Sequence, residues 1–168
     1  HLAHMDYLMG CIASALGQHA KAVSLFETAI AAFRSLGWPP EVFTTLCYLS
    51  YTLWAQGKIA QAKAHLMEAL RFGIETGHYF TLVLGLIGAA LLLISQGDCT
   101  RAVAFWAGVS VWWPQVKAYR WLWDVAGRHI EAAAAARDDQ DVGAWNAPAR
   151  LDGVEATDCG RHLRRARL

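Results

Sequence analysis

The sequence predicts an all-α protein built from stacked helical hairpins, and two observations support this prediction. Ala, Leu and Trp are abundant among the 168 residues, whereas only four residues are Pro and few stretches alternate between apolar and polar positions as strands do. In addition, Gly17, Gly57 and Gly97 follow one another at intervals of forty residues, and Gly37 and Gly77 repeat that interval. A fixed period of this length, with one helical hairpin in each period, is typical of a helical solenoid.

Three segments align at this period, and each is an apolar helix that ends at Gly and is followed by a second helix. They are MGCIASALGQHAKA (9–22), LSYTLWAQGKIAQA (49–62) and AALLLISQGDCTRA (89–102). Small residues share three columns of the alignment and bulky residues share a fourth. The columns are Gly10, Ser50 and Ala90; Ala22, Ala62 and Ala102; Ala29, Ala69 and Val109; and Phe26, Leu66 and Trp106. Helices that cross closely need a small side chain at the crossing and a bulky one beside it, so the columns predict three hairpins over residues 1–112.

The first two hairpins carry recognisable helix signals. The sequence begins within a first helix, where Asp6 stands at a normally bulky position. The next helix carries one apolar stripe at helical spacing, formed by Val23, Phe26, Ile30 and Phe33. A further helix is expected over 41–56, because Pro39 and Pro40 favour a helix start and Glu41 places an acid in the first turn.

The third hairpin begins with an uncharged stretch, 76–97, that is long enough to suggest a membrane span. A span requires about 20 apolar residues with suitable flanks, and this run is interrupted by Thr81, Gly85, Gly88 and Ser95. Residues 81–96 also align with the helix at 41–56, and both segments end in Gln-Gly. We therefore expect a buried core helix and no membrane partner. Asp98 is expected to cap the helix that follows.

The aligned columns resemble the tetratricopeptide repeat, which places a small residue in the first helix, Gly at the turn, and then Ala, an aromatic residue or Leu, and Ala along the second helix. The first copy matches with Gly10, Gly17, Ala22, Phe26 and Ala29, the second with Leu49, Ser50, Gly57, Ala62, Leu66 and Ala69, and the third with Ala90, Gly97, Ala102, Trp106 and Val109. The period exceeds the ~34 residues usual for this repeat. The resemblance covers about residues 5–110 and implies a right-handed superhelix whose first helices bind a protein or peptide.

Residues 113–158 are expected to form capping helices, including a long helix at about 117–137. From residue 117 this part resembles the end of the repeat domain in bacterial LuxR-type regulators and related signal-transduction ATPases. The matching residues are Ile130–Ala136, Asp138, Asp139, Trp145, Leu151, Glu155 and Ala156. The resemblance implies a C-terminal interaction or sensor fragment of a cytoplasmic bacterial transcriptional regulator, which responds to a protein, a peptide or a small-molecule effector. The alternative is a free-standing scaffold protein.

Charge and cysteine usage narrow the function classes. The tail 159–168 carries four of the 15 basic residues and is expected to be disordered, which leaves eleven bases against fourteen acids elsewhere. Because acidic residues outnumber basic ones in residues 1–158, this part of the chain is not expected to offer a basic surface for nucleic acid. The four scattered cysteines include no CxxC pair, so we expect reduced thiols and a cytoplasmic location.

Two groups of residues are candidate binding sites. The middle first helix carries polar and aromatic side chains that are candidate partner contacts: Thr44, Thr45, Tyr48, Tyr51 and Thr52. The alternative for these residues is packing against the neighbouring repeat. An aromatic group near the C-terminal end forms either a pocket for a flat ligand or, as we favour, a cap on the open end of the solenoid: Trp106, Trp112, Trp113, Tyr119, Trp121 and Trp123.

The sequence contains no recognisable catalytic motif. GxSxG, HExxH and clustered Cys/His patterns are missing, and His78 is expected to be a loop or cap residue rather than a general base. Asp138, Asp139 and Asp141 resemble the aspartate-rich motif of isoprenoid synthases, which are also all-helical. Their spacing does not place them on one helix face, and a turn exposed to solvent is the simpler interpretation. We expect no enzyme activity, cofactor or metal, with a Mg-dependent isoprenoid-type enzyme as a remote alternative.

Overall fold

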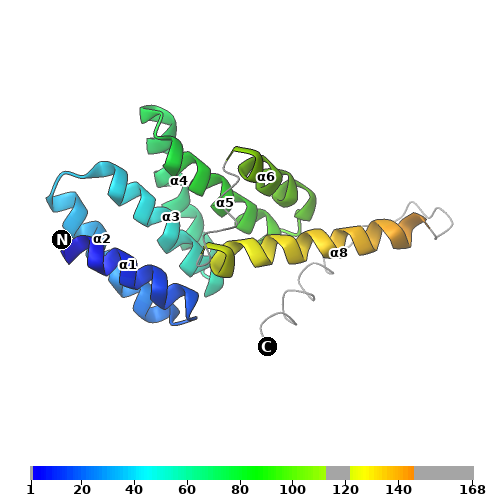
Figure 1. Ribbon diagram of the computed structural model, residues 1–168, viewed down its shortest axis with the longest axis horizontal. Helices are drawn as coiled ribbons and strands as arrows, with labels where there is room; N and C mark the ends of the chain where they lie inside the picture. Colours follow the sequence, from blue (N-terminus) through cyan, green and yellow to red (C-terminus); the bar gives the residue numbers. More distant parts are fainter. Residues whose placement is uncertain (1, 113–121, 146–168) are drawn as a thin grey trace.

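The computed structural model describes residues 2–112 and 122–145, and every element in these ranges is helical. The elements are α1 (Leu2–Ala15), α2 (His19–Ser35), α3 (Pro39–Ala55), α4 (Ile59–Thr76), α5 (Tyr79–Ser95), α6 (Cys99–Trp112), the π-helix η2 (Trp123–Gly127) and α8 (Arg128–Trp145). Consecutive helices pack as the hairpins α1–α2, α3–α4 and α5–α6, which stack side by side (Figure 1). The predicted all-α, tetratricopeptide-like solenoid is therefore confirmed.

Glycine makes every turn between α1 and α6. Five Gly residues at intervals of twenty have positive φ angles between 65° and 81°: Gly17, Gly37, Gly57, Gly77 and Gly97. A Cβ atom disfavours this left-handed region. In the first turn Gly17 N–H donates to Ser14 O (3.0 Å) and Gln18 N–H donates to Ala13 O (2.8 Å), which is a Schellman motif. Gln18 O then accepts from Ala22 N–H (3.0 Å), so α2 starts immediately and the two helices are held close together.

Small residues lie where helices cross closely, at Gly10 as the alignment predicted and also at Gly88, which lies outside its columns. A Cβ atom on Gly10 would lie 2.7 and 2.8 Å from ring carbons of Phe26, and one on Gly88 would lie 2.6 Å from Leu66 Cδ1. Phe26 and Leu66 are buried and occupy the same column of the repeat. Small and bulky side chains therefore interlock within the first hairpin and again between the second and third hairpins.

Helix α5, which contains the uncharged stretch, is a core helix. The helix packs against α3, α4 and α6. Its buried side chains include Val83, Leu84, Ile87 and Leu91. Among the described residues, no helix combines the length and apolar character that crossing a bilayer requires. The helix ends at Ser95, one residue before the predicted end.

The C-terminal part differs from the prediction of a helix at 117–137 followed by an acidic turn. The chain forms η2 and then continues through α8 without a break past position 137. Arg stands at 137, where the earlier repeats have Gly, so no residue favours a left-handed turn, and the Ala-rich run before it favours helix. Helix η2 contacts α1, α3 and α5, while α8 contacts α5 and α6 and then extends beyond the stack (Figure 1). The basic tail 159–168 lies outside the described residues.

We predict that Gly10→Ala destabilises the protein by about 1–3 kcal/mol, because the new methyl group collides with the buried Phe26 ring. Gly108→Ala in α6 is the matched control, since nothing lies within 4 Å of a Cβ atom at that position. The control should stabilise the helix by roughly 0.5–1 kcal/mol. Urea unfolding followed by circular dichroism measures both, and equal shifts in the same direction would contradict the close crossing.

Asp98 caps α6 as predicted and gives the fold an acid-sensitive contact. Its Oδ1 accepts from Arg101 N–H (3.0 Å) and its Oδ2 lies 2.5 Å from Arg101 Nε. The backbone hydrogen bond first, and then the side-chain bond, lower the pKa of Asp98 from its ordinary value. The stabilisation is therefore present above the unfolded-state pKa of about 4 and is lost as pH falls through the lower folded-state pKa.

Asp98→Asn should keep the cap but remove this titration, so stability should fall less steeply with acid in the variant than in the unchanged protein. Urea midpoints measured at neutral pH and at several values below 4 make the comparison. Parallel curves for the two proteins would show that the contact does not titrate as inferred.

Candidate functional site

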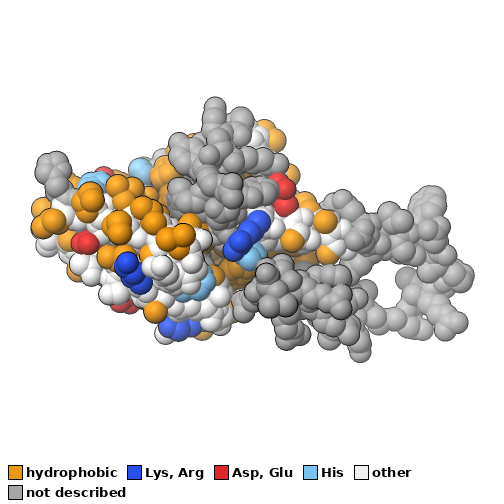
Figure 2. Space-filling model, turned by 60° about the horizontal axis from the view of Figure 1, so that its bottom comes forward, with side chains coloured by type: hydrophobic (Ala, Val, Ile, Leu, Met, Phe, Trp, Pro, Cys, Tyr) orange, Lys and Arg blue, Asp and Glu red, His pale blue; other side chains and the backbone are white. Residues whose placement is uncertain are grey.

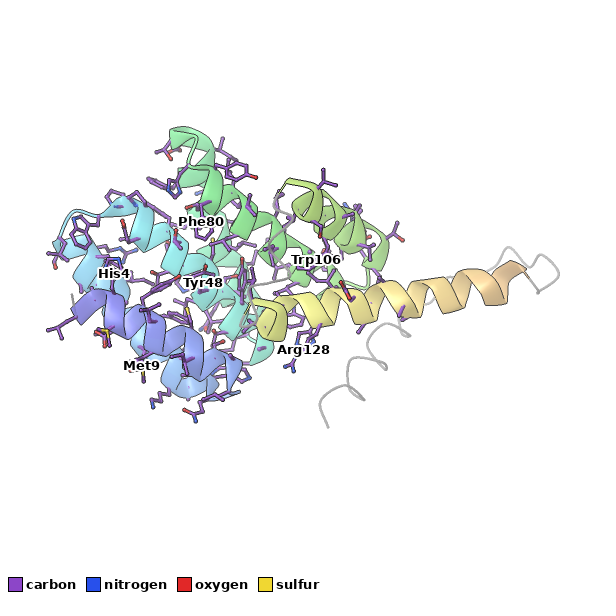
Figure 3. All side chains as sticks on the ribbon, in the orientation of Figure 1. His4, Met9, Tyr48, Phe80, Trp106 and Arg128 are labelled. Carbon is purple, nitrogen blue, oxygen red and sulfur yellow. The ribbon has the colours of Figure 1, made fainter. Side chains whose placement is uncertain are left out.

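A pocket of about 260 Å³ lies at the N-terminal ends of α1, α3 and α5, the first helices of the three hairpins. Its lining residues are His4 and Tyr7 of α1, Phe33 of α2, Pro40, Glu41, Thr44 and Thr45 of α3, His78 at the cap of α5, and Phe80 of α5. Figure 3 shows His4 and Phe80 at this end of the stack and Tyr48 nearer its middle. Three repeats therefore contribute their first turns to one concave site.

Aromatic side chains form the walls at the α1 side of the pocket. The ring of His4 meets Phe33 edge-on, with centroids 5.0 Å apart, and lies 5.7 Å from the ring of Trp38. Phe33 is itself buried, so the wall is anchored in the core. Tyr7 stacks on Tyr48 with centroids 5.4 Å apart. Burial is the main cause that raises the pKa of Tyr7 above its ordinary value, so its hydroxyl stays protonated.

Glu41 supplies the carboxylate of the pocket. It is half-buried in the first turn of α3, where the helix dipole favours an acid. The ion pairs within the described residues are Arg34–Glu68 and Asp98–Arg101, and neither involves Glu41. No Lys or Arg is among the described residues that line the pocket. A half-buried carboxylate beside aromatic rings can attract a positively charged group from a ligand.

His78 is a cap residue, as expected. Its Nδ1 lies 2.7 Å from Thr81 Oγ1 and accepts the Thr81 N–H at 3.4 Å, which satisfies the first turn of α5. One edge of the pocket is therefore fixed by the hydrogen bonds that start α5. These bonds already engage Nδ1, so His78 shapes the site and holds Phe80 in place through the helix start.

Only two of the five predicted groove residues line the pocket. Thr44 is half-buried, and Thr45 is buried and donates its hydroxyl hydrogen to Glu41 O at 2.6 Å. The other three, Tyr48, Tyr51 and Thr52, are each 3% exposed or less. They pack against neighbouring repeats, which was the alternative given for this group.

These three side chains connect α3 to the first helices on either side of it. Tyr51 Oη donates to Leu84 O in α5, and Thr52 Oγ1 lies 2.9 Å from Ser14 Oγ in α1. Helix η2 also contacts this row of helices, so the C-terminal segment covers part of the surface on which a partner was expected. Among the described residues, the pocket at the helix starts is an open part of this surface.

The aromatic group predicted near the C-terminal end is described only in part. Trp106 is buried and takes its place in the bulky column of the third hairpin. Trp112 and Trp123 lie in α6 and η2, and their side chains are outside the description, as are Trp113, Tyr119 and Trp121 altogether. An aromatic contact that the sequence did not predict joins α3 to α8, where the rings of Trp54 and His129 lie 5.1 Å apart and edge-on.

Cysteine chemistry differs from the expectation at one position. Cys11 and Cys47 are buried free thiols, and burial is the main cause that raises the pKa of Cys11 to about 12 and raises that of Cys47 as well. Both therefore stay uncharged at neutral pH and act as small apolar residues. Cys99 is disulfide-bonded, so the expectation of a reduced thiol is wrong there.

No group of three His, Cys, Asp or Glu residues in the described ranges could hold a metal ion. Asp138, Asp139 and Asp141 lie along α8 rather than in the expected turn, and their side chains are outside the description.

Most of the pocket was missed by reasoning from the sequence, although a signal for it exists. His4 and Thr44 are forty residues apart, as are Pro40 and Phe80, so equivalent first-turn positions of successive repeats meet at the site. The search for polar residues along one helix found Thr44 but missed His4, Pro40 and Phe80. Comparing residues forty positions apart near the starts of α1, α3 and α5 would have found four of the lining residues.

Comparison with known proteins finds a similarity for part of the chain. Residues 1–75 match the family model of the tetratricopeptide repeat, which spans α1 to nearly the end of α4. No curated protein and no solved structure matches the chain significantly. The third hairpin lies beyond this match but has the same left-handed Gly turn as the first two.

We predict that Tyr51→Phe destabilises the protein by about 1–2 kcal/mol, because a buried hydrogen bond to Leu84 O is lost. Thr28→Val is the control, since it removes an exposed hydroxyl bond to Ser24 O within one helix and should change stability by less than about 0.5 kcal/mol. Thermal unfolding measures both variants. If Tyr51→Phe were as harmless as the control, the link between α3 and α5 would carry no stability.

Proposed function

We propose that the chain is a protein-interaction module that binds a peptide segment in the pocket between the first turns of α1, α3 and α5. Solenoid repeats present continuous concave surfaces to their partners, which supports an interaction role for this fold. The observation that carries the choice of site is the half-buried Glu41 carboxylate, which lies beside aromatic walls and has no ion-pair partner in the described chain.

The chemistry of the pocket favours an apolar side chain that adjoins a positive charge. Tyr7, Phe33 and Phe80 offer aromatic surface that accepts either an apolar group or a cation. Glu41 supplies the charge complement, and the absence of Lys and Arg from the described lining leaves it available. A volume of about 260 Å³ lies below the usual size of a drug-like site, so one or two side chains of a longer peptide occupy it.

At the level of the whole protein, we infer the repeat region of a bacterial transcriptional regulator. The support is the resemblance of the sequence from Ile130 to Ala156 to the end of such repeat domains. A bound partner or small effector would act on attached domains only if it binds their two states with different affinity.

The coding DNA upstream of His1 tests this context. A P-loop motif and a DNA-binding or cyclase segment in the same reading frame support the regulator. A start codon within one or two repeats would contradict it and leave a free-standing scaffold.

For the pocket itself, we predict that phage-displayed random peptides selected on the chain share an apolar residue next to Lys or Arg. Glu41→Gln should weaken binding of a selected peptide about tenfold or more, because a charge-assisted contact contributes roughly 1.5–3 kcal/mol. Glu68→Gln on the exposed face of α4 is the charge-matched control and should leave binding unchanged. Isothermal titration calorimetry gives the dissociation constants.

Two results would overturn the assignment of this site. Selected peptides that bind Glu41→Gln and the unchanged chain equally would place recognition elsewhere on the surface. A selection that yields no peptide, together with thermal stabilisation by small aromatic amines, would assign the pocket to a small-molecule effector instead.

A further inference from the structure

Two histidines from different helices line the pocket, and the proposed peptide contacts use neither of them. His4 on α1 is exposed, and its ring meets Phe33 edge-on with centroids 5.0 Å apart. His78 is half-buried at the cap of α5, and its ring lies 6.1 Å from that of Phe72 in α4. In Figure 2, histidine side chains reach the surface among hydrophobic ones at the end of the molecule where α1 lies. The pocket therefore carries titratable side chains besides its carboxylate.

The net charge of the pocket depends on these imidazoles and on Glu41. Tyr7 also lines the pocket, but burial raises its pKa and keeps its hydroxyl uncharged. No Lys or Arg is among the described lining residues, and neither Asp6 of α1 nor Glu75 of α4 is among them. Histidine is the side chain whose charge ordinarily changes between pH 5 and 8. With both imidazoles neutral, Glu41 alone gives the described lining a charge of −1, and two imidazolium groups change this to +1.

Protonation of His78 also acts on the start of α5. Its Nδ1 accepts the Thr81 N–H at 3.4 Å and lies 2.7 Å from Thr81 Oγ1. A ring nitrogen that accepts a hydrogen bond carries no hydrogen, so in the neutral ring Nε2 holds the proton, and an added proton must go to Nδ1. A protonated Nδ1 cannot accept, so the amide of the buried Thr81 loses its cap. Because Phe80 lies in this first turn, the same proton that changes the charge of the pocket also loosens one of its walls.

We propose that protonation of His4 and His78 releases the ligand, so the pocket binds a positively charged segment at neutral pH and loses it in mild acid. The ligand is the cationic peptide of the proposed function, on which this proposal rests. At neutral pH Glu41 attracts its charge, whereas in mild acid two imidazolium groups repel it. A pocket of about 260 Å³ keeps its wall charges within roughly one screening length of the ligand, ~8 Å at physiological salt. Salt therefore screens these charges only in part.

Isothermal titration calorimetry of one selected peptide at about pH 7.5 and about pH 5.5 tests the proposal, since histidine ordinarily titrates between these values. The peptide should have blocked ends, Arg as its cation, and no His, Asp or Glu, so that its own charge stays constant. The dissociation constant should rise about tenfold or more at the lower pH, because attraction is replaced by repulsion.

Variants identify the groups that titrate. His4→Gln combined with His78→Asn removes both imidazoles, while Asn keeps a side-chain oxygen that can cap α5. Each protein is compared with itself at the two pH values, and in the double variant the dissociation constant should change by about twofold or less. His65→Gln is the matched control, since His65 is a half-buried histidine of α4 that does not line the pocket, and it should keep the full change. Equal changes in the double variant and the unchanged chain would trace the effect to another group and overturn the proposal.

The amide NMR signal of Thr81 in the ligand-free chain tests the helix start without a ligand. It should shift between the two pH values in the unchanged chain and stay in place in His78→Asn, and a fixed signal in both would overturn the role of His78. A peptide that binds equally well at both pH values would overturn the control by protons and leave the proposed function intact. A selection that yields no peptide dependent on Glu41 would instead overturn the proposed function, and with it the release by acid.

Discussion

The left-handed glycine turn is the constraint on which the rest of the structure depends. Each turn uses one Gly to end a helix and the next residue to start another, so the helices between successive turns have nearly equal lengths. Equal lengths keep the forty-residue columns in register. That register brings Gly10 against Phe26 and Gly88 against Leu66, and it sets the first turns of α1, α3 and α5 beside one another. Close packing and the pocket thus have the same origin.

The first helices divide their surface between contacts that hold the stack together and the pocket proposed as the binding site. Toward their C-terminal halves, the buried contact of Ser14 with Thr52 and the part-buried contact of Trp54 with Ser95 join neighbouring repeats, and η2 packs against the same row. Toward their N-terminal ends the same row opens into the pocket. Because Tyr48, Tyr51 and Thr52 of the middle helix hold the stack together, they do not line the pocket, whereas Glu41, Thr44 and Thr45 of the same helix do. The contacts that hold the stack together and the proposed binding site therefore lie on different turns of the same helices.

The fold was largely predictable from the sequence, whereas the site was not. Gly at a fixed interval and alternating small and bulky columns are local signals, and each reports directly on a turn or a crossing. The exposure of a side chain depends on parts of the chain that are distant in sequence. Tyr51 and Thr52 are residue types that often contact partners at a surface, yet α1 and α5 bury them. The length of α8 was misjudged because a turn was expected at Asp138 and Asp139, whereas position 137, forty residues after Gly97, carries Arg and not the Gly that makes the earlier turns. The pocket depends on side chains from four helices, and such convergence is visible only in three dimensions.

The twenty-residue interval also determines how such a chain can change length. Removing one residue inside a helix would rotate everything after it by about 100°, so small and bulky side chains would no longer meet at the crossings. Removing or adding a whole hairpin of forty residues leaves every remaining contact column intact. Chains of this kind should therefore tolerate growth and loss in whole hairpins and resist single insertions within helices. The glycine turns therefore define the unit, one helical hairpin, by which such a chain can be lengthened or shortened.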